Sequence, residues 1–451
     1  MTMKSFAGSK ALVMGLGRFG GGVDAVRFLH GAGAQVMVTD VASAAQLGES
    51  LGQLADLSPI EFHLGGHLEE DFERADVVVV NPAVPLSNKF VRLARELGKV
   101  VTSQMNIFFD LCSAAIVGIT GANGKSTTTA LTAHLLRARA DRDVWLGGNI
   151  GNEPLLMVVD RIKPDDVVAL EISSFQIEQL AQEGKAPDIA LLTNLTPNHL
   201  DRYGSFEAYC AAKEQMFRLQ RPRDKRVCVS IFNAEDRVGC EWFNKYSIDG
   251  DRKCIKFSAD DVSEEIRSHW RLPGRGNLSN LAAALSVARH FGVGDECVKG
   301  CLSKFKALPH RLELVADIGG VRWYNDSKAT TPEGAMTALE AFDCPKIIIA
   351  GGYDKQIEFN ELGKNIATNA KAAILVGQTA QKIADAITAC VKKQTQIEIV
   401  DSLANAVSRA SQLAASGDVV MLSPACASYD MFENYQQRGQ EFVKLVRAIV
   451  K

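Results

Sequence analysis

The sequence lacks the patterns by which several large classes of protein are recognised. No apolar run reaches the roughly 18 residues that a membrane-spanning helix needs, and the start, MTMKSFAGSK, contains no apolar signal-peptide core. Internal repeats and low-complexity tracts are also absent. The net charge is only −3, which argues against bulk binding of nucleic acid or of an anionic membrane. We therefore expect a cytoplasmic protein that binds neither, and that holds any anionic ligand in a local site.

The cysteines also lack the spacing of a metal or redox site. Ten are present, but there is no C-x-x-C pair and no Cys/His cluster with zinc spacing. Cys297 and Cys301 could meet on one face of a helix, yet two thiols alone make a poor metal site. We predict that all ten thiols are reduced and that most of them are packing residues.

What is present indicates a large α/β protein. The chain has 451 residues, enough for about three domains at roughly 150 residues each. Along the chain, short apolar strand candidates alternate with amphipathic helical patterns, which is typical of parallel sheets covered by helices. We predict a Rossmann-like domain at residues 1–105, a phosphate-loop ATPase-like domain with a mostly parallel sheet at 106–307, and a Rossmann-like α/β domain at 308–451.

The most informative stretch is Ala115–Leu136. An apolar run enters a glycine turn that ends at Gly124, and Lys125 and four hydroxyl residues then open a helical pattern. Backbone N–H groups of such a turn converge on an anion, and the helix dipole adds to the attraction. Position 119 is isoleucine where the strict phosphate-loop pattern has glycine, so a plain strand–turn–helix is the alternative. The flanking strand and helix favour ATP binding, with the following loop residues: Gly121, Ala122, Asn123, Gly124, Lys125, Ser126 and Thr127.

A second glycine pattern lies near the N-terminus. The predicted strand Lys10–Met14 enters Gly15-Leu-Gly17-Arg-Phe-Gly20, and Asp40 follows the next strand, twenty residues beyond Gly20. This is the pattern of a dinucleotide site, in which the acid binds ribose hydroxyls. It predicts only a diphosphate-ribosyl ligand. NAD, a UDP-sugar and a turn that binds nothing all remain open.

Three further residues of the central region are candidate magnesium ligands. Glu171 ends the predicted strand Asp166–Leu170, where ligands gather in parallel sheets; a solvated acid is the alternative. His199 lies in a polar loop, where an ordinary hydrogen-bonding histidine is the alternative. Lys213 lies on the apolar stripe of a helix, so it either extends outward to water or is desolvated with a lowered pKa. A desolvated free amine would react with CO₂ to form a carbamate, which is an additional oxygen ligand.

Polar groups also follow three predicted strands of the last third, at Asn325–Thr330, Gly351–Lys355 and Ser423–Ser428. Three such clusters at the strand ends of one sheet predict a site. Thr331 and Pro332 are a good helix start. Asn277 and Asn280 open another helix, either as caps or as amides for a nucleobase. Leu308–Arg311 is predicted to be a linker whose Arg311 swings onto bound phosphates.

Taken together, these segments resemble the Mur ligases of peptidoglycan synthesis, and within them the branch that adds D-glutamate. The similarity covers nearly the whole chain. Its most specific segments are GANGKST (Gly121–Thr127), EISSFQIE (Glu171–Glu178), NHLDRY (Asn198–Tyr203), LPHR (Leu308–Arg311), NDSKAT (Asn325–Thr330) and LSPACAS (Leu422–Ser428). The family's short phosphate loop accounts for the missing glycine. Its first domain holds the UDP of the acceptor substrate, which favours UDP over NAD.

The resemblance implies a role for each matching residue. Ser126, Glu171, His199 and a carbamylated Lys213 would bind Mg²⁺, with two ions expected. Asn277, Asn280, Arg311 and Asp326 would join the phosphate loop in binding ATP. Gly17, Arg18, Phe19, Asp40, Asn81 and Asn149 would bind the UDP substrate. Thr330, Lys355, Ser428 and the backbone near Tyr435 would bind D-glutamate. The catalytic set would be Lys125, His199, Lys213, Asp326 and Lys328.

The family pattern is not followed everywhere. Val41-Ala42 stands where many relatives have Thr-Arg, and Asn81-Pro82-Ala83 replaces the usual Ser-Pro-Gly, so the contacts to uridine are expected to differ in detail. Tyr435 stands where phenylalanine is common, which matters little if only its N–H is used.

The implied activity is ATP-dependent addition of D-glutamate to UDP-N-acetylmuramoyl-L-alanine through an acyl phosphate, in cytoplasmic peptidoglycan precursor synthesis. The partners would be small molecules and the protein a monomer. Three alternatives stay open: a ligase of the same family with another amino acid, a nicotinamide-dependent oxidoreductase that leaves the phosphate loop idle, and a binding protein that uses nucleotide only as a switch.

Overall fold

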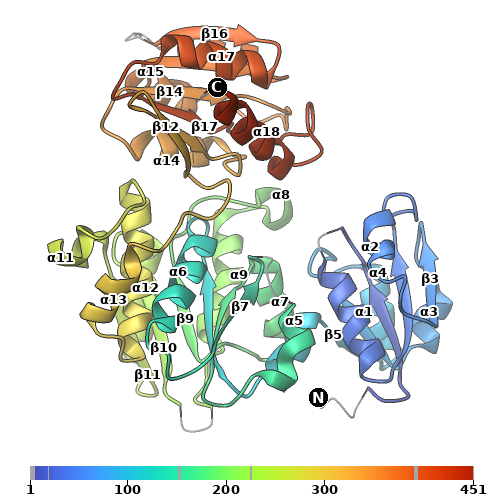
Figure 1. The fold of residues 1–451 in the computed structure, drawn as a ribbon. Coiled ribbons are helices and arrows are strands. Elements are labelled where there is room, and N and C mark those ends of the chain that lie inside the picture. Colours follow the sequence, from blue (N-terminus) through green and yellow to red (C-terminus); the bar gives the residue numbers. More distant parts are fainter. Residues whose placement is uncertain (1–5, 19, 151–153, 224–225, 391–394, 450–451) are drawn as a thin grey trace. The chain divides into compact units, whose positions relative to one another are not determined.

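Helices and strands alternate along the whole chain and build three separate sheets (Figure 1). The structure is a computed structural model that describes residues 6–18, 20–150, 154–223, 226–390 and 395–449. Internal contacts divide the chain into two compact units. The first unit comprises Met1–Asp261 and Asn280–Val298, and the second comprises Val262–Ser279 and Lys299–Lys451. The predicted α/β class is confirmed, whereas the domain boundaries at residues 105 and 307 stay predictions.

The first sheet has five parallel strands in the order β3-β2-β1-β4-β5. They are β1 (Lys10–Met14), β2 (Gln35–Asp40), β3 (Ile60–Leu64), β4 (Val77–Val80) and β5 (Val100–Thr102). Its helices are α1 (Gly21–Gly31), α2 (Gly48–Gly52), α3 (Glu69–Arg74) and α4 (Lys89–Glu96). The apolar runs of the sequence predict strands at Lys10–Met14, Gln35–Thr39, Ile60–Leu64, Asp76–Val80 and Lys99–Thr102, and all five are present within one residue at either end. They are recognisable because runs such as VVVV in β4 are buried along their whole length.

The second sheet has six parallel strands in the order β11-β10-β9-β6-β8-β7. They are β6 (Ala115–Thr120), β7 (Val144–Gly148), β8 (Val167–Glu171), β9 (Ile189–Leu192), β10 (Cys228–Asn233) and β11 (Arg252–Phe257). Its helices include α6 (Lys125–Arg137), α7 (Ser174–Gln182), α8 (Leu200–Tyr203), α9 (Phe206–Arg218), α10 (Arg237–Tyr246) and α12 (Arg275–His290). Since β6 lies between β9 and β8, the loop after β6 opens beside the ends of two other buried strands. A capping box starts α7, with Ser173 and Gln176 bonded reciprocally.

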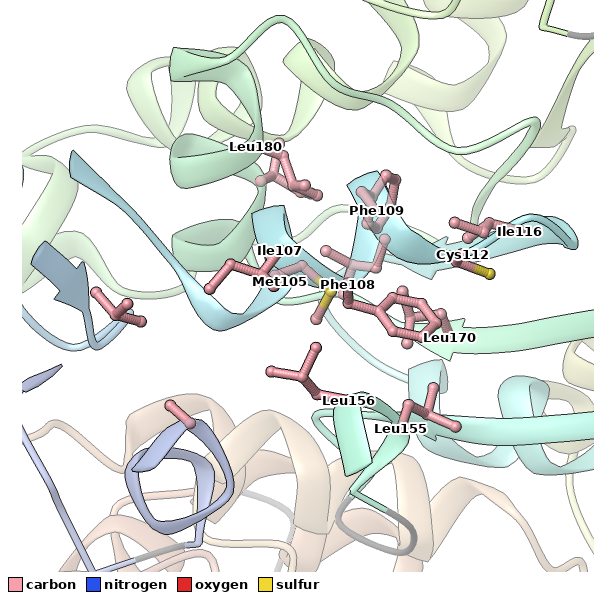
Figure 2. Close-up of a cluster of buried hydrophobic side chains, with 14 of the residues drawn as sticks. Met105, Ile107, Phe108, Phe109, Cys112, Ile116, Leu155, Leu156, Leu170 and Leu180 are labelled. Carbon is pink, nitrogen blue, oxygen red and sulfur yellow. The ribbon is translucent and has the colours of Figure 1, made fainter. Parts of the chain in front are cut away.

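The helix α5 (Gln104–Leu111) connects the first sheet to the second and packs into the core of the second (Figure 2). Its side chains Ile107 and Phe108 are 0% and 3% exposed. Figure 2 shows them among Leu155 and Leu156 of the short helix η2 (Leu155–Arg161) and Leu170 of β8. Burial of each such side chain contributes about 1.5–3 kcal/mol, so α5 is firmly fixed to the second sheet.

The third sheet has the order β12-β13-β17-β14-β15-β16 and forms the second unit. Its strands are β12 (Glu313–Ile318), β13 (Val321–Asn325), β14 (Lys346–Ala350), β15 (Ala372–Val376), β16 (Gln396–Val400) and β17 (Val419–Leu422). Strand β12 is antiparallel to β13, and the other pairs are parallel. The helices are α14 (Pro332–Glu340), α15 (Asn360–Asn369), α16 (Ala380–Thr388), α17 (Leu403–Leu413) and α18 (Tyr435–Ala448). Thr331 caps α14 and Pro332 is its first residue, as predicted.

Three smaller findings concern the cysteines, a metal cluster and the membrane. All ten cysteines are free. Most of them are packing residues, as predicted: three are buried (Cys112, Cys228 and Cys426), and four more pack against the cores (Cys210, Cys254, Cys344 and Cys390). Among the described residues, no group of three or more His, Cys, Asp and Glu side chains is arranged to hold a metal. In the same part of the chain, no helix is long and apolar enough to cross a membrane.

Candidate functional site

The loop between β6 and α6 has a backbone conformation that favours glycine. Gly124 has φ 80° and forms the N-cap of α6, and Gly121 has φ 149°. A Cβ on Gly124 would lie 2.2 Å from the Oδ1 atom of Asn280, and one on Gly121 would lie 2.0 Å from the Oγ1 atom of Thr193. The loop is therefore packed tightly from two sides, with its N–H groups at the start of a helix of 13 residues. That is the arrangement predicted for phosphate binding.

Three of the predicted residues meet behind this loop. The hydroxyl of Ser126 donates a short hydrogen bond to Oε2 of Glu171, and both residues are buried. Asn149, after β7, donates from Nδ2 to the other carboxylate oxygen at 3.3 Å and from its backbone N–H to the Glu171 carbonyl at 3.0 Å. The Lys125 ammonium donates to the Ala122 carbonyl within the loop at 2.8 Å. The arrangement places one buried carboxylate beside the cationic loop.

Lys213 is buried in the same region. It is 1% exposed, its Nζ atom donates to Oγ1 of Thr120 at 3.0 Å, and Nζ lies 5.0 Å from the ring centre of Tyr209. Burial lowers the pKa of its ammonium well below the usual value, and the charge of Lys125 acts in the same direction while Glu171 opposes it. Of the two outcomes left open by the sequence, the desolvated lysine is the one observed. A neutral amine is the form that can react with CO₂.

His199 lies at the start of α8 rather than within an open loop. It is the N-cap residue with φ 52°, and its ring centre lies 5.1 Å from that of Phe175 and 6.2 Å from that of Tyr209. Loss of water on this side lowers the pKa of the imidazole. The imidazole is thus neutral at neutral pH, the form in which histidine binds metals.

These donors fit both implied ligands. Mg²⁺ prefers oxygen and commonly takes only one or two protein carboxylates together with phosphate oxygens and water. A buried carboxylate with an adjacent hydroxyl, Glu171 and Ser126, is such a partial set. A nucleotide fits because the N–H groups of this glycine loop lie at the N-terminus of α6, where they and the helix dipole attract phosphate.

In the first sheet, the glycine loop is held by the two polar residues expected to contact the UDP substrate. Asp40, 6% exposed, accepts the Gly17 N–H at 3.0 Å and the Ala42 N–H at 2.8 Å. Asn81 donates to the Gly15 carbonyl at 3.1 Å. Each oxygen of the Asp40 carboxylate thus accepts one backbone N–H group, and its contact with ribose hydroxyls stays a prediction. Arg18 is exposed, and the Phe19 prediction lies outside the described residues.

The two asparagines of α12 are not caps. Both lie inside the helix, which begins at Arg275, so the capping interpretation is wrong. Asn280 accepts the Thr128 hydroxyl at 3.2 Å and lies against Gly124, at the phosphate loop. Asn277 donates to the Pro273 carbonyl at 2.8 Å. Their proposed contacts with ATP stay predictions.

In the second unit, Asp326 follows β13 and is buried. Its Oδ2 accepts the Ser423 hydroxyl at 2.8 Å and its Oδ1 accepts the Leu312 N–H at 3.1 Å. Burial raises the pKa of Asp326 to about 7, although both hydrogen bonds act against that rise. Lys328 lies two residues further on, with Nζ 5.1 Å from the Tyr435 ring centre.

The segment predicted as a linker is fixed to this unit. The His310 ring is hydrogen-bonded to the Asn325 amide at 2.9 Å, and the His310 N–H donates to Glu313 at 2.9 Å. With the bond from Leu312 to Asp326, the chain is held from His310 onward. Free swinging of the whole segment is therefore not supported, and a contact of Arg311 with phosphate stays a prediction.

The residues predicted to bind D-glutamate lie after three neighbouring strands, β13, β17 and β14. Thr330 follows β13, Lys355 is exposed after β14, Ser428 is 2% exposed after β17, and Tyr435 begins α18. The Ser327 hydroxyl donates to the Tyr435 carbonyl at 2.8 Å, which ties the β13 loop to α18.

The sequence analysis missed Arg438, which is 2% exposed beside these loops. It donates to the Ser327 carbonyl at 2.8 Å, the Ser327 hydroxyl at 3.0 Å and the Cys426 carbonyl at 3.0 Å. Burial lowers the pKa of its guanidinium to about 10. Its position one turn before Phe442, on the apolar face of α18, is the same signal that singled out Lys213.

Comparison with known families covers most of the chain. The family model described as the Mur ligase MurD-like N-terminal domain matches residues 9–103, the Mur ligase middle domain matches 119–288, and the Mur ligase glutamate ligase domain matches 310–426.

The chain is also similar over its full length to named relatives. The UDP-N-acetylmuramoylalanine–D-glutamate ligase of Roseiflexus sp. (strain RS-1) is 39% identical over 98% of this chain and 99% of the relative. The enzyme of the same name from Caldanaerobacter subterraneus is 37% identical over 97% of this chain and 98% of its own.

Solved structures share the fold at lower identity. A MurF ligase from Thermotoga maritima in complex with ADP has a TM-score of 0.56 at 16% identity, with 99% of this chain and 97% of that chain covered. A pseudomurein peptide ligase type C from Methanothermus fervidus has a TM-score of 0.55 at 15% identity, with 98% and 100% covered.

Proposed function

This chain belongs to the Mur ligase family, and on that premise we propose that it joins D-glutamate to UDP-N-acetylmuramoyl-L-alanine with hydrolysis of ATP. The observation that carries the proposal is the full-length similarity, at 36–39% identity, to relatives named for this reaction. The packed glycine loop before α6 supports the use of ATP. The oxidoreductase alternative would leave that loop without a purpose.

The reaction needs activation because a carboxylate is a poor electrophile. The L-alanyl carboxylate attacks the γ-phosphorus of ATP and forms an acyl phosphate with release of ADP. The amine of D-glutamate then attacks the acyl carbon, and the tetrahedral intermediate loses a proton and phosphate to give the amide. The protein mainly has to position the groups and neutralise phosphate charge. Lys125, Lys328 and Arg311 are proposed for this charge neutralisation, and Asp326 joins them in binding ATP.

Magnesium is the second cofactor of the proposal, with two ions expected. When bound, it would neutralise phosphate charge. Ser126, Glu171 and His199 would hold it, with a carbamate on Lys213. The burial of Lys213, which lowers its pKa and so favours the neutral amine, supports the carbamate: the lone pair of the amine forms the N–C bond to CO₂ and one proton is released.

Substrate contacts complete the proposal. Gly17, Arg18, Phe19, Asp40, Asn81 and Asn149 are assigned to the UDP substrate, and Thr330, Lys355, Ser428 and Tyr435 to D-glutamate. Asp40 would act mainly by shaping the glycine loop, as its backbone hydrogen bonds suggest. We also propose that the enzyme is a cytoplasmic monomer with domain boundaries near residues 105 and 307.

The test is phosphate release from ATP with Mg²⁺, UDP-N-acetylmuramoyl-L-alanine and a panel of amino acids. Release only with D-glutamate is expected. Release with another amino acid would keep the ligase mechanism but refute the assigned substrate. No release across the panel, or saturable NADH binding without any response to ATP, would overturn the proposal.

A further inference from the structure

Arg202 lies at the centre of a set of contacts to which neither the resemblance nor the proposed mechanism assigns a role. It belongs to α8, three residues after His199. Its Nη2 atom donates to Oε2 of Glu178 at 2.7 Å, and its guanidinium carbon lies 3.8 Å from the ring centre of Phe175. A longer hydrogen bond of 3.4 Å runs from Nη1 to the Pro82 carbonyl. Its side chain is 19% exposed, so the guanidinium is largely enclosed by these partners.

The Phe175 ring connects Arg202 to His199. Arg202 and the imidazole of His199 both pack on this ring, the latter with ring centres 5.1 Å apart. The Phe175 and Tyr203 rings lie 6.2 Å apart, and Tyr203 lies 5.6 Å from Tyr209. The imidazole is thus supported by a ring whose own position is fixed by the guanidinium.

The turn that carries His199 has little stability of its own. Helix α8 has only four residues, no side chain caps it, and His199 has a positive φ of 52°. A single helical turn is unfavourable in isolation, and a non-glycine residue in the left-handed region adds strain. External contacts must therefore hold this turn, and those of Arg202 to α7 are the strongest that the turn makes through a charged side chain in the described structure.

We propose that Arg202 is a positioning residue that fixes the His199 turn against α7 and joins it to the loop after β4. This inference rests on the proposed function, because the metal role of His199 and the substrate role of Asn81, next to Pro82, are themselves proposed. Arginine suits the task because its planar guanidinium can stack on a ring while donating along its edges to a carboxylate and a carbonyl. Lysine can keep the ion pair but not the stacking.

The experiment separates metal binding from turnover. Wild type, R202Q and R202K are compared for Mn²⁺ binding by electron paramagnetic resonance, with the β,γ-imido analogue of ATP present. We expect R202Q to weaken Mn²⁺ binding by about tenfold or more, as loss of a residue that orients a metal ligand usually does. The Mn²⁺ affinity of R202K is expected to remain close to that of R202Q.

Steady-state kinetics give a second readout that a general loss of structure would not produce. R202Q should raise the KM for UDP-N-acetylmuramoyl-L-alanine, because the contact to Pro82 is lost. The KM for D-glutamate should stay within about twofold, since its proposed residues belong to the second unit. The matched control is R409Q, a substitution in the second unit. Arg409 donates two hydrogen bonds to Glu398, and its loss should change neither of these KM values.

The variant F175L keeps Arg202 and removes only the ring, so it should reproduce the loss of Mn²⁺ affinity even if R202Q folds poorly. Unchanged Mn²⁺ affinity in F175L, or in a folded R202Q, would overturn the inference. Full recovery in R202K would overturn it too, because charge alone would then suffice. A wild-type enzyme that binds Mn²⁺ and nucleotide but releases no phosphate with D-glutamate would instead refute the assigned reaction.

Discussion

Lys213 donates a 3.0 Å hydrogen bond to the hydroxyl of Thr120, and neither residue has more than 1% of its surface exposed. Thr120 ends β6 and lies directly before the phosphate loop. A charged ammonium is costly in such surroundings, so burial lowers the pKa of Lys213 and favours its neutral form next to the proposed metal ligands.

The first prediction concerns the carbamate that this amine can form. Lys213→Ala should lower activity by at least about 10- to 100-fold, the usual effect of losing a metal-site group. Formate or acetate should then restore part of the activity, because a small carboxylate can occupy the space and supply the missing oxygen. The measurement is phosphate release against carboxylate concentration, with the wild type as control. Absence of rescue at every concentration would count against the carbamate.

The second prediction concerns the lysine of the phosphate loop. Lys125→Ala should abolish turnover because no other described side chain of the loop carries a positive charge. Phosphate release measures the effect, and Lys444→Ala is the control, since that side chain is 77% exposed on α18. A near-normal kcat in Lys125→Ala would refute the assignment of the loop.

The third prediction tests the packing of the loop. Gly124→Ala places a Cβ 2.2 Å from the Asn280 side chain and should prevent binding of an ATP analogue, measured by calorimetry. Gly184→Ala is the matched control: its φ is also positive, at 66°, but nothing lies within 4 Å of the added carbon. Both changes carry about 1–2 kcal/mol of backbone strain, so only Gly124→Ala should lose the nucleotide. Equal affinities in the two variants would show that the close approach is unimportant.

The fourth prediction concerns pH. The pKa of Asp326 is about 7 in the folded protein and 3.8 in an unfolded chain, so the folded state binds a proton between these values. The associated stability is fully present below pH 3.8 and is lost as pH rises through 7. Asp326→Asn cannot titrate and should therefore be more stable than the wild type at pH 8, by an amount on the order of a few kcal/mol. The advantage should vanish near pH 4.

Thermal unfolding of the wild type and of Asp326→Asn between pH 4 and 8 measures this difference. Asparagine retains an acceptor for the Leu312 N–H, and the Ser423 hydroxyl can reverse its role, so packing is little changed. Parallel pH profiles for the two proteins would contradict a raised pKa.

Much of the fold could be predicted because buried parallel strands are continuous apolar runs. This held for all five strands of the first sheet and all six of the second. In the third sheet, the sequence predicts five strands, at Val321–Tyr324, Lys346–Ala350, Ala373–Val376, Ile397–Val400 and Val419–Leu422, and the sheet has a sixth. Strand β12, ELVADI, is an antiparallel edge strand with half-exposed side chains, and its two charged residues interrupt any apolar run.

Site residues could be predicted where a side chain departs from the polar and apolar pattern of its own helix or strand. Lys213 stood out because a lysine on an apolar helix stripe conflicts with the helix's own pattern, and the structure shows it buried. The partner of Asp40 could not be predicted, because the pattern shows an acid at the right distance but not that its oxygens accept N–H groups of the loop itself. Of the two interpretations left open for the asparagines of α12, capping was wrong because the helix begins at Arg275, before both of them.

The edge strand β12 also has a practical use. Glu313 pairs with Asn325 at the end of β13 that is followed by residues proposed to bind D-glutamate. Ile318 and Val321 pair at the opposite end of the strand. The tight turn between them is Gly319-Gly320, both with positive φ, and an added side chain at Gly319 meets nothing within 4 Å. A fluorescent reporter or an affinity tag placed at this turn is therefore separated from the substrate loops by the length of a strand, and it can follow the second unit without disturbing its chemistry.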